Sequence, residues 1–561
     1  MPMFQQYDSL VADTYSACGK LALDMDLLPL AFQFLSKALD RNPIHIVTLL
    51  LLCDGYKKDT ATVAQNHTRV VELLVNSINS NSEIARDYRI WKELALSYAK
   101  LNIPHDALNS ISQALAMEPA RDSSLWVIQS RVLLLLISVT QQQPFKTLLA
   151  YFNKAVEVST TQQDVHMQVE AHICLAQLYH RYGDFNEALN ELTNSLNLLN
   201  SILYHESYSR ARFDKLTYIY KFIATLEFKS NRSIQAKRVC QEALTTLPHT
   251  DQIQQMIITL AQLCYFDANP AAGIKTLTDE INLALPDHHP FMLDYLLGRF
   301  YSKLDDSQKS YEHYQIALQH NQKSPLPWIS VGAVYLKTGQ LHDSLTAYSQ
   351  AVSLALQEDL SMAPYTIKFY RLFAAFAWFG ISQVYGETHQ VQDSVNAYRQ
   401  SSALFRSEND LLNAQEMEQR CNLLMASPHQ KQTLTIPDVP VQLLLDMALH
   451  EDQSVFSVEE TPKQSQMHLS PPPPPAANVS SNPVFRTSGK VSRTSNASPH
   501  NSPPVHTKRV SAGTTPTMRN VQLPIPPSQH HSPVLVQQMN MSVQPSASHS
   551  TGFEPSPMAM V

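Results

Sequence analysis

Glycine is scarce in this chain, because only 12 of its 561 residues are glycine. This scarcity argues against a turn-rich all-β protein and against the glycine-lined loops that hold nucleotide phosphates. A strong charge of one sign is also missing, since the formal net charge at pH 7 is only −7. No overall positive field therefore draws the chain toward nucleic acid or an anionic membrane.

Motifs for metal binding and catalysis are absent as well. The six cysteines are scattered and none belongs to a CxxC pair, so a zinc site and a disulfide framework are both poorly supported. The sequence contains no GxGxxG, HExxH or GxSxG motif and no complete phosphate-binding loop. We therefore expect a protein of a reducing compartment that is not an enzyme and has no cofactor and no metal.

Long apolar runs are also missing. The longest, Ile46–Cys53 and Val132–Val139, fall well short of the ~20 residues that a transmembrane helix needs. The first residues lack the basic start and apolar run of a secretory signal. We expect no membrane association, and we interpret the two runs as buried faces of helices.

Large aromatic residues disappear toward the C-terminus. All four tryptophans and all 23 tyrosines precede residue 399, whereas 21 of the 34 prolines follow residue 426. A segment with so few apolar groups cannot offset the entropy lost on ordering, so residues 426–561 are predicted to be a disordered tail rich in Pro, Ser and Gln. The apolar stretch Val441–Leu449 is the exception. It either docks on a partner as a short helix or caps the last folded unit, and the cap is the preferred interpretation.

The rest of the chain repeats itself. Residues 292–324 align with residues 326–358 at an offset of 34 residues. The matching residues are Gly298 and Gly332, Tyr301 and Tyr335, Tyr314 and Tyr348, and Ala317 and Ala351. This offset and this alternation of small and large residues are typical of tetratricopeptide (TPR) repeats.

Further units with the same pattern lie upstream and downstream. Their characteristic positions are taken by Gly19, Trp91, Ala95, Tyr98, Ala107, Trp328, Tyr385 and Tyr398. About ten units can be counted, so the predicted fold is all-α: a TPR solenoid, which is a right-handed superhelix of antiparallel helix pairs. Small residues are expected where the helices of a pair cross closely, and aromatic residues in the wider gaps between pairs.

Four regions follow from the repeats and the composition. Residues 1–121 hold the N-terminal TPR units, and residues 122–290 hold degenerate units. Residues 291–425 hold the units that match best, and residues 426–561 form the tail.

The inner wall of such an array is lined by the first helix of each pair and holds extended or helical segments of partners. In the TPR clamps of co-chaperones, one unit carries an asparagine directly after the small position. The residues at that place here are Lys20, Asp54, Leu96, Gln177, Thr225, Arg299, Ala333 and Gln383. None is asparagine, which makes a co-chaperone clamp a weaker hypothesis.

The stretch Asp294–Val352 resembles the TPR subunit of the fungal general transcriptional corepressor, and also the TPR region of UTX-type histone demethylases. The unit that contains Tyr385 and Tyr398 continues the similarity, which covers roughly residues 290–405. The resemblance to the corepressor implies a nuclear adaptor, with a cytoplasmic pool also compatible. Such an adaptor bridges DNA-binding transcription factors to a WD40-repeat (Tup-type) corepressor subunit and reads no DNA sequence itself.

By the same resemblance, residues 1–121 hold the WD40-repeat subunit. Candidate partner-binding residues on the inner wall there are Asp13, Ser16, Lys20, Arg89 and Lys92, which are explained equally well as solvated surface groups. Two alternatives stay open: a TPR scaffold of a ubiquitin ligase, RNA-decay or trafficking complex, and a co-chaperone.

Overall fold

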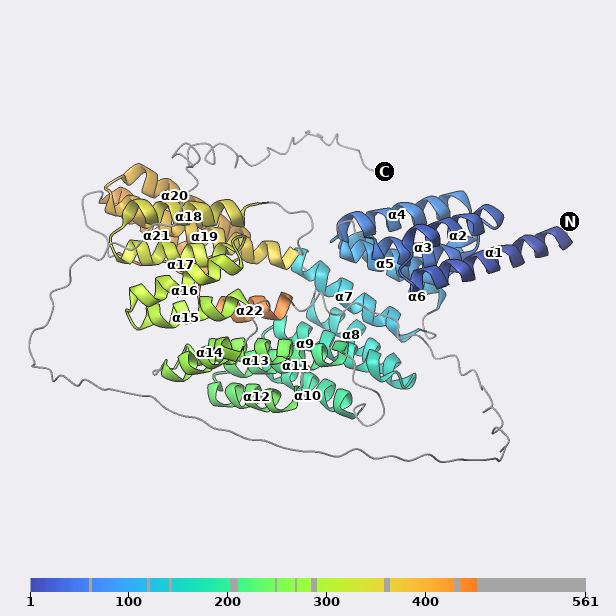
Figure 1. The fold of residues 1–561 in the computed structure, drawn as a ribbon, viewed down its shortest axis with the longest axis horizontal. Coiled ribbons are helices and arrows are strands. Elements are labelled where there is room, and N and C mark those ends of the chain that lie inside the picture. The colour runs from blue at the N-terminus through green and yellow to red at the C-terminus, as the bar shows by residue number, and fades with distance from the viewer. Residues whose placement is uncertain are drawn as a thin grey trace, which may run out of the picture. The chain divides into compact units, whose positions relative to one another are not determined.

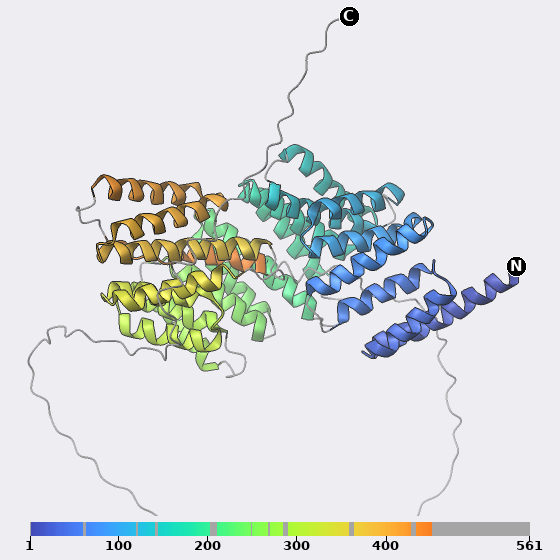
Figure 2. The same cartoon turned by 90° about the horizontal axis from the view of Figure 1, so that it is seen from above.

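The computed structural model describes residues 2–59, 63–118, 122–140, 144–201, 210–247, 250–267, 270–283, 290–357, 364–427 and 434–451. Within these ranges every regular element is a helix, and from α1 to α21 neighbouring helices along the chain lie side by side (Figures 1 and 2). The predicted tail from residue 452 to residue 561 lies outside the described residues.

Twenty of the helices form ten packed pairs, as in a TPR solenoid. In chain order the pairs are α1 (Pro2–Asp24) with α2 (Leu28–Arg41), α3 (Ile46–Lys58) with α4 (Val63–Ser80), α5 (Tyr88–Lys100) with α6 (Pro104–Met117), α7 (Ser123–Thr140) with α8 (Phe145–Thr161), α9 (Val165–Arg181) with α10 (Phe185–Ser201), α11 (Arg210–Lys229) with α12 (Ser233–Thr246), α13 (Thr250–Cys264) with α14 (Ala271–Leu283), α15 (Phe291–Lys303) with α16 (Ser307–His320), α17 (Pro325–Lys337) with α18 (Leu341–Ala355), and α19 (Pro364–Glu387) with α20 (Val391–Ser407). A short 3-10 helix (Ile84–Arg86) precedes α5, and α21 (Leu411–Ala426) and α22 (Val441–Glu451) follow the pairs.

A residue in the left-handed conformation ends the first helix of many pairs. After α17 this residue is Gly339, with φ of 77°, and the next N–H, that of Gln340, donates to the Tyr335 carbonyl at 2.8 Å. This bond satisfies a carbonyl at the helix end and turns the chain into the second helix. The same bond closes the turns after α5, α15 and α19, where the acceptors are the carbonyls of Tyr98, Tyr301 and Tyr385.

Glycines let the helices come close at the buried ring of Tyr348 on α18. A Cβ atom at Gly332 of α17 would lie 3.0 Å from this ring, and one at Gly380 of α19 would also collide with it. Ser344, one turn before Tyr348, donates from its Oγ to the Gly332 carbonyl at 2.8 Å. Within the pair the small residue permits the close crossing, and Tyr348 fills the space toward the next pair.

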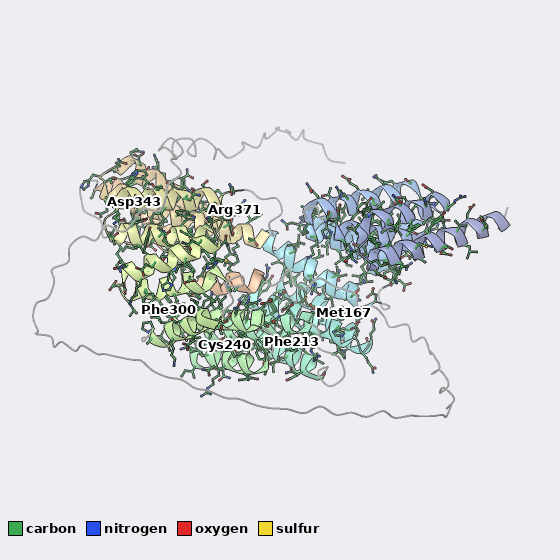
Figure 3. All side chains as sticks on the ribbon, viewed as in Figure 1. Met167, Phe213, Cys240, Phe300, Asp343 and Arg371 are labelled. Atoms are coloured by element: carbon green, nitrogen blue, oxygen red, sulfur yellow. The ribbon has the colours of Figure 1, made fainter. Side chains whose placement is uncertain are left out.

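The same kind of contact recurs along the chain. A Cβ atom at Gly298 would strike the ring of Tyr314, and one at Gly19 would lie 2.5 Å from Leu35. In Figure 3 the labelled Phe300 marks a further example, because its ring packs against Gly273 of α14. Close contacts within pairs and between pairs are therefore built from a small residue that faces a large one.

Successive pairs stack through their first helices, since α13 contacts α15, α15 contacts α17 and α17 contacts α19. Helices α15 and α17 begin 34 residues apart, at Phe291 and Pro325. Helices α9 and α11 begin 45 residues apart, at Val165 and Arg210. Longer helices and links thus hide the repeat in the upstream sequence, although the pairing of helices is the same.

The apolar core is a row of local clusters. One face of α7 contributes Ile128 and Val132 to a cluster with Ile111 of α6. Another face of α7 contributes Leu134 to a cluster with Phe152 of α8. Helix α7 is apolar on both faces because it has a neighbouring pair on each side, as expected for an array. None of the helices within the described ranges is long and apolar enough to cross a membrane.

We predict that Gly380→Ala destabilises the protein by about 1–3 kcal/mol, because the added methyl group has no space beside Tyr348. The matched control is Gly386→Ala in the same helix, where the nearest atom to an added Cβ is 3.9 Å away. This control should leave stability unchanged or raise it by up to about 1 kcal/mol, since alanine favours helix. Urea denaturation followed by circular dichroism measures both; equal effects would contradict the packing described for Tyr348.

Burial of His67 on α4 makes stability depend on pH. Its Nδ1 lies 3.3 Å from Ser97 Oγ. Burial, assisted by the charges of Lys57 and Lys100, lowers the pKa of His67 to about 4. Because this folded-state pKa lies below the unfolded value of about 6.5, the stabilisation is complete above pH 6.5 and is lost as the pH falls toward 4.

We predict that wild type loses about 1–2 kcal/mol through His67 between pH 7 and pH 5. The variant His67→Gln lacks the titrating group, so its stability should fall less over this interval. The control His342→Gln, at an exposed position on α18, should follow wild type. Denaturation at the two pH values tests this, and an unchanged pH dependence in His67→Gln would show that His67 does not titrate as described.

Candidate peptide-binding site

Residues 434–451, which we call the C-terminal segment, return along the stack and pack on its helices. Residues 434–440 are not helical, and α22 follows them and contacts α11, α13 and α19 (Figure 1, orange helix). Pro437 and Pro440 lack a backbone N–H and restrict the residues before them, which keeps this stretch out of a helix. The segment therefore presents an extended part and a helical part to one surface.

The apolar side chains of the C-terminal segment are buried. Val439 and Leu444 are 0% exposed, Leu445 is 1% exposed and Val441 is 2% exposed. Complete burial of such a side chain contributes about 1.5–3 kcal/mol relative to exposure. These four side chains give the segment a hydrophobic anchor on the stack.

Three consecutive residues of the extended part are held by polar groups. The Asp438 carboxylate accepts a hydrogen bond from Ser330 Oγ at 2.8 Å and lies 3.2 Å from Arg299 Nη1. The same Nη1 donates to the Val439 carbonyl at 2.6 Å. The Tyr348 hydroxyl donates to the Pro437 carbonyl at 2.9 Å. Helices α15, α17 and α18 thus converge on residues 437–439.

The two ends of the C-terminal segment show its direction. Near its start, the Thr435 N–H donates to Gln383 Oε1 of α19 at 3.1 Å. In α22, Asp446 pairs with Lys229 of α11 at 2.6 Å, and Lys221 Nζ lies 3.4 Å from the Ala448 carbonyl. The segment therefore runs from α19 toward α11, opposite to the order of the helices along the chain.

Arg299 also contacts side chains of the stack itself. Its Nη1 lies 3.1 Å from the Tyr295 hydroxyl, and its guanidinium carbon lies 5.7 Å from the ring centre of Tyr265. Burial alone would lower the pKa of Arg299, but the Asp438 carboxylate raises it above its ordinary value, so the side chain stays charged. A buried guanidinium needs such a partner, which makes this position selective for a carboxylate.

The arrangement is suited to binding. Carbonyl groups, one carboxylate and apolar side chains of a peptide are met by fixed donors and by a hydrophobic surface. In the described ranges, His, Cys, Asp and Glu form no group of three or more that could hold a metal ion. The contacts of the site hold a chain segment, residues 437–439, through main-chain carbonyl groups and one carboxylate.

The residues predicted to bind a partner near the N-terminus lie on two helices. Asp13, on α1, is exposed and lies 2.9 Å from His45 Nε2. On the same helix, Ser16 is buried and Lys20 is exposed. On α5, Arg89 is exposed and pairs with Asp87 at 2.7 Å, and Lys92 is buried and pairs with Asp122 at 3.0 Å. Three of the five thus belong to the first pair and two to the third, and their partner-binding role stays a prediction.

Arg299 and Gln383 were not predicted as binding residues. A signal for them existed, because both directly follow the small residue of a first helix, Gly298 or Ser382. This is the position at which a co-chaperone clamp carries its asparagine. The sequence shows no asparagine there, but it does show the arginine and the glutamine that contact the C-terminal segment.

Two expectations for the region after residue 426 need correction. The disordered tail was predicted to begin at residue 426 with Val441–Leu449 as its exception, whereas the whole of residues 434–451 is folded because its apolar side chains find a surface to pack on. The stretch Val441–Leu449 was interpreted as a cap on the last unit. Instead, α21 packs against α20, and α22 packs against α11, α13 and α19.

In the N-terminal and central pairs, charged side chains on the first helix of one pair form ion pairs with side chains on the first helix of the next. Lys57 of α3 pairs with Glu93 of α5 at 2.5 Å. Glu170 of α9 pairs with Arg131 of α7 and, at 2.7 Å, with Lys215 of α11. Burial would raise the pKa of Glu170, but the two cations lower it below its ordinary value. These ion pairs join successive units.

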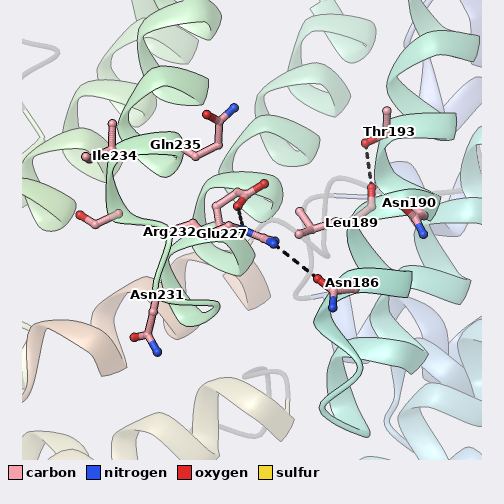
Figure 4. Close-up of a pocket in the computed structure, with 10 residues that line it drawn as sticks. Asn186, Leu189, Asn190, Thr193, Glu227, Asn231, Arg232, Ile234 and Gln235 are labelled. Atoms are coloured by element: carbon pink, nitrogen blue, oxygen red, sulfur yellow. Dashed lines mark hydrogen bonds and ion pairs between the residues drawn. The ribbon is translucent and has the colours of Figure 1, made fainter.

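A depression that is separate from the C-terminal segment lies between α10 and α12 and has a volume of about 870 Å³ (Figure 4). Its lining is mainly amide, hydroxyl and aliphatic groups, together with Arg232, which pairs with Glu227 and lies 3.5 Å from Asn186 Oδ1. The charged groups thus neutralise each other. This depression presents neither a nucleophile beside a base nor a charge left for a ligand.

Neither protein-family models nor curated protein sequences gave a match to the chain. Among solved structures, the quorum sensor NprR from B. thuringiensis is 12% identical with a TM-score of 0.38, covering 61% of this chain and 97% of its own. A tetratricopeptide repeat protein from Parabacteroides merdae is 14% identical with a TM-score of 0.32, covering 56% of this chain and 94% of its own. The APC/C hetero-tetramer Cut9-Hcn1 is 13% identical with a TM-score of 0.31, covering 81% of this chain and 95% of its own. Likeness at this level says nothing about partners.

We predict that Tyr348→Phe loosens the C-terminal segment, because it removes the hydrogen bond to the Pro437 carbonyl. Amide hydrogen exchange in residues 434–451 should become about 3- to 10-fold faster, in keeping with about 1 kcal/mol for one such bond. The matched control is Tyr335→Phe, whose hydroxyl donates to Tyr311 Oη at 3.0 Å. This control should leave exchange in the segment unchanged, and faster exchange in both variants would point to a general loss of stability.

Proposed function

We propose that this protein is a transcriptional corepressor adaptor, in which a TPR scaffold bridges DNA-binding transcription factors to a WD40-repeat corepressor subunit. The proposal has a general part, a scaffold for protein partners, and a particular part, the identity of those partners. The two parts have different support.

The general part is supported by one observation above all. A peptide segment lies on the helix pairs, with its carboxylate at Arg299 and its leucines buried. This surface binds an extended chain and a short helix, which is how TPR arrays hold partners. A scaffold that holds other proteins is the function that this geometry supports.

The particular part is supported by the place of the sequence resemblance. Residues 290–405 resemble the corepressor subunit, and they include α15 to α19 and all but the last two residues of α20. Arg299, Ser330, Tyr348 and Gln383, which contact the C-terminal segment, all lie in this range. The resemblance thus coincides with a peptide-contacting part of the array, as expected if that part binds transcription factors.

The WD40-repeat subunit is assigned to residues 1–121, which contain α1 to α6. Lys20 and Asp13 offer exposed charges of both signs on α1 for such a partner. A nuclear location belongs to the same proposal. A scaffold of a ubiquitin ligase, RNA-decay or trafficking complex is the alternative, and its partners would be of a different class. A co-chaperone is disfavoured by the missing clamp asparagine.

Affinity purification of the full chain with mass spectrometry tests the proposal, together with a reporter gene to which the chain is tethered. We expect a WD40-repeat corepressor subunit and DNA-binding factors among the bound proteins, and repression of the reporter. The variant Lys20→Glu should reduce recovery of the WD40-repeat subunit several-fold. Lys37→Glu, at an exposed position on α2, is the matched control and should not reduce it. Recovery of ligase, RNA-decay or chaperone subunits without repression would contradict the corepressor assignment.

A further inference from the structure

We propose that the surface bound by the C-terminal segment, formed by α11, α13, α15, α17, α18 and α19, is a docking site that a partner and the segment occupy in turn. The partner presents an acidic residue in an extended, proline-containing stretch, followed directly by a leucine-rich helix with a second acidic residue. This inference rests on the scaffold function proposed above and specifies its partner class. Residues 434–451 are the protein's own copy of that ligand.

The chemistry of the partner follows from the contacts of the segment. Asp438 meets Arg299 at 3.2 Å, and Asp446 in α22 meets Lys229 at 2.6 Å. The two cations are thus presented to acidic residues eight positions apart in one peptide. Between them, Leu444 and Leu445 are buried. Charge complementarity at both ends and an apolar middle define the ligand.

Much of the remaining recognition does not depend on the sequence of the peptide. The Tyr348 hydroxyl, Arg299 Nη1 and Lys221 Nζ all reach main-chain carbonyl groups. Every peptide has main-chain carbonyl groups, so these side chains can donate hydrogen bonds to any peptide that follows the same path. Selection is left to the acidic residues and the leucines, and a second chain that carries them satisfies the same surface.

Occupation by the protein's own segment regulates this surface. A ligand on the same chain acts at an effective concentration on the order of millimolar. A free partner then binds only in proportion to the time for which the surface is vacant, which weakens its apparent affinity. When the segment leaves, Arg299 loses its carboxylate and regains one only from a partner with an acidic residue at that place. The segment therefore excludes weak ligands and favours acidic ones.

The test uses the full chain and a fluorescein-labelled peptide with the sequence of residues 434–451. The release variant Leu444→Asp/Leu445→Asp weakens the internal segment and leaves the docking surface unchanged. In fluorescence anisotropy, we expect the release variant to bind the labelled peptide at least tenfold more tightly than wild type does. The matched control is Leu412→Asp on α21, where the leucine is 82% exposed, and it should behave as wild type.

A second peptide tests the chemistry of recognition. The labelled peptide with Asp438→Asn and Asp446→Asn should bind the release variant at least tenfold more weakly than the unmodified peptide. Should the release variant prove misfolded by circular dichroism, Asp438→Ala in the full chain takes its place, because it removes one charge and no core side chain. Equal binding of the peptide to wild type and a folded release variant, or no binding to either, would overturn the proposal.

Recovery of bound proteins from extract distinguishes a failure of the docking inference from a failure of the proposed function on which it rests. The release variant should recover DNA-binding factors from extract in larger amounts than wild type, and excess unlabelled peptide should remove them. If both proteins capture the same corepressor partners equally and the peptide does not compete, the docking inference is wrong while the adaptor function stands. If neither protein captures such partners but the peptide results hold, the adaptor function is wrong and the docking surface stands.

Discussion

Tyr348 lies buried between Gly332 of α17 and Gly380 of α19; an added Cβ atom would collide with its ring at Gly380 and would press tightly against it at Gly332. The contact sets how closely α17 approaches α18 and how far it stands from the next pair. Contacts of this kind are local, so a chain can repeat them without building one large core. Each pair adds its own cluster of buried side chains, and the stack grows as long as a small residue faces a large one at each crossing.

The same tyrosine connects the packing to the candidate binding site. Its ring separates two pairs, and its hydroxyl donates to the Pro437 carbonyl of the C-terminal segment. Arg299 likewise connects packing with binding, because it directly follows Gly298 at a close helix crossing and its guanidinium lies beside the Tyr295 hydroxyl. A residue next to a close crossing is held by the crossing itself. Binding groups on such positions need little further ordering when a peptide arrives, which lowers the entropic cost of binding.

Much of this fold could be predicted because its packing contacts join residues that lie close together in the sequence and recur at a regular offset. The offset from Gly298 to Gly332 reports a crossing that is formed twice, and the helix-pair solenoid predicted from it is confirmed. The tyrosines near the ends of the first helices were predicted as large residues of the repeat. Their main-chain carbonyls also accept the hydrogen bonds that close the turns. The residues in the left-handed conformation are harder to foresee, since the non-glycine residues Asn102, Asp305 and His389 take after other helices the role that Gly339 has after α17.

The path of the C-terminal segment could not be predicted in the same way. Asp438 lies 139 positions after Arg299 in the sequence, and no periodicity connects the two residues. Composition did mark Val441–Leu449 as apolar, but apolar character does not say which surface a helix will cover. Charge offers the missing constraint, because Lys57, Arg131 and Lys215 find carboxylates on neighbouring first helices, whereas Arg299 and Lys229 find theirs on the segment. In this chain, the cations that find carboxylates on residues 434–451 therefore mark the surface that the segment covers, which no periodicity of the repeats indicates.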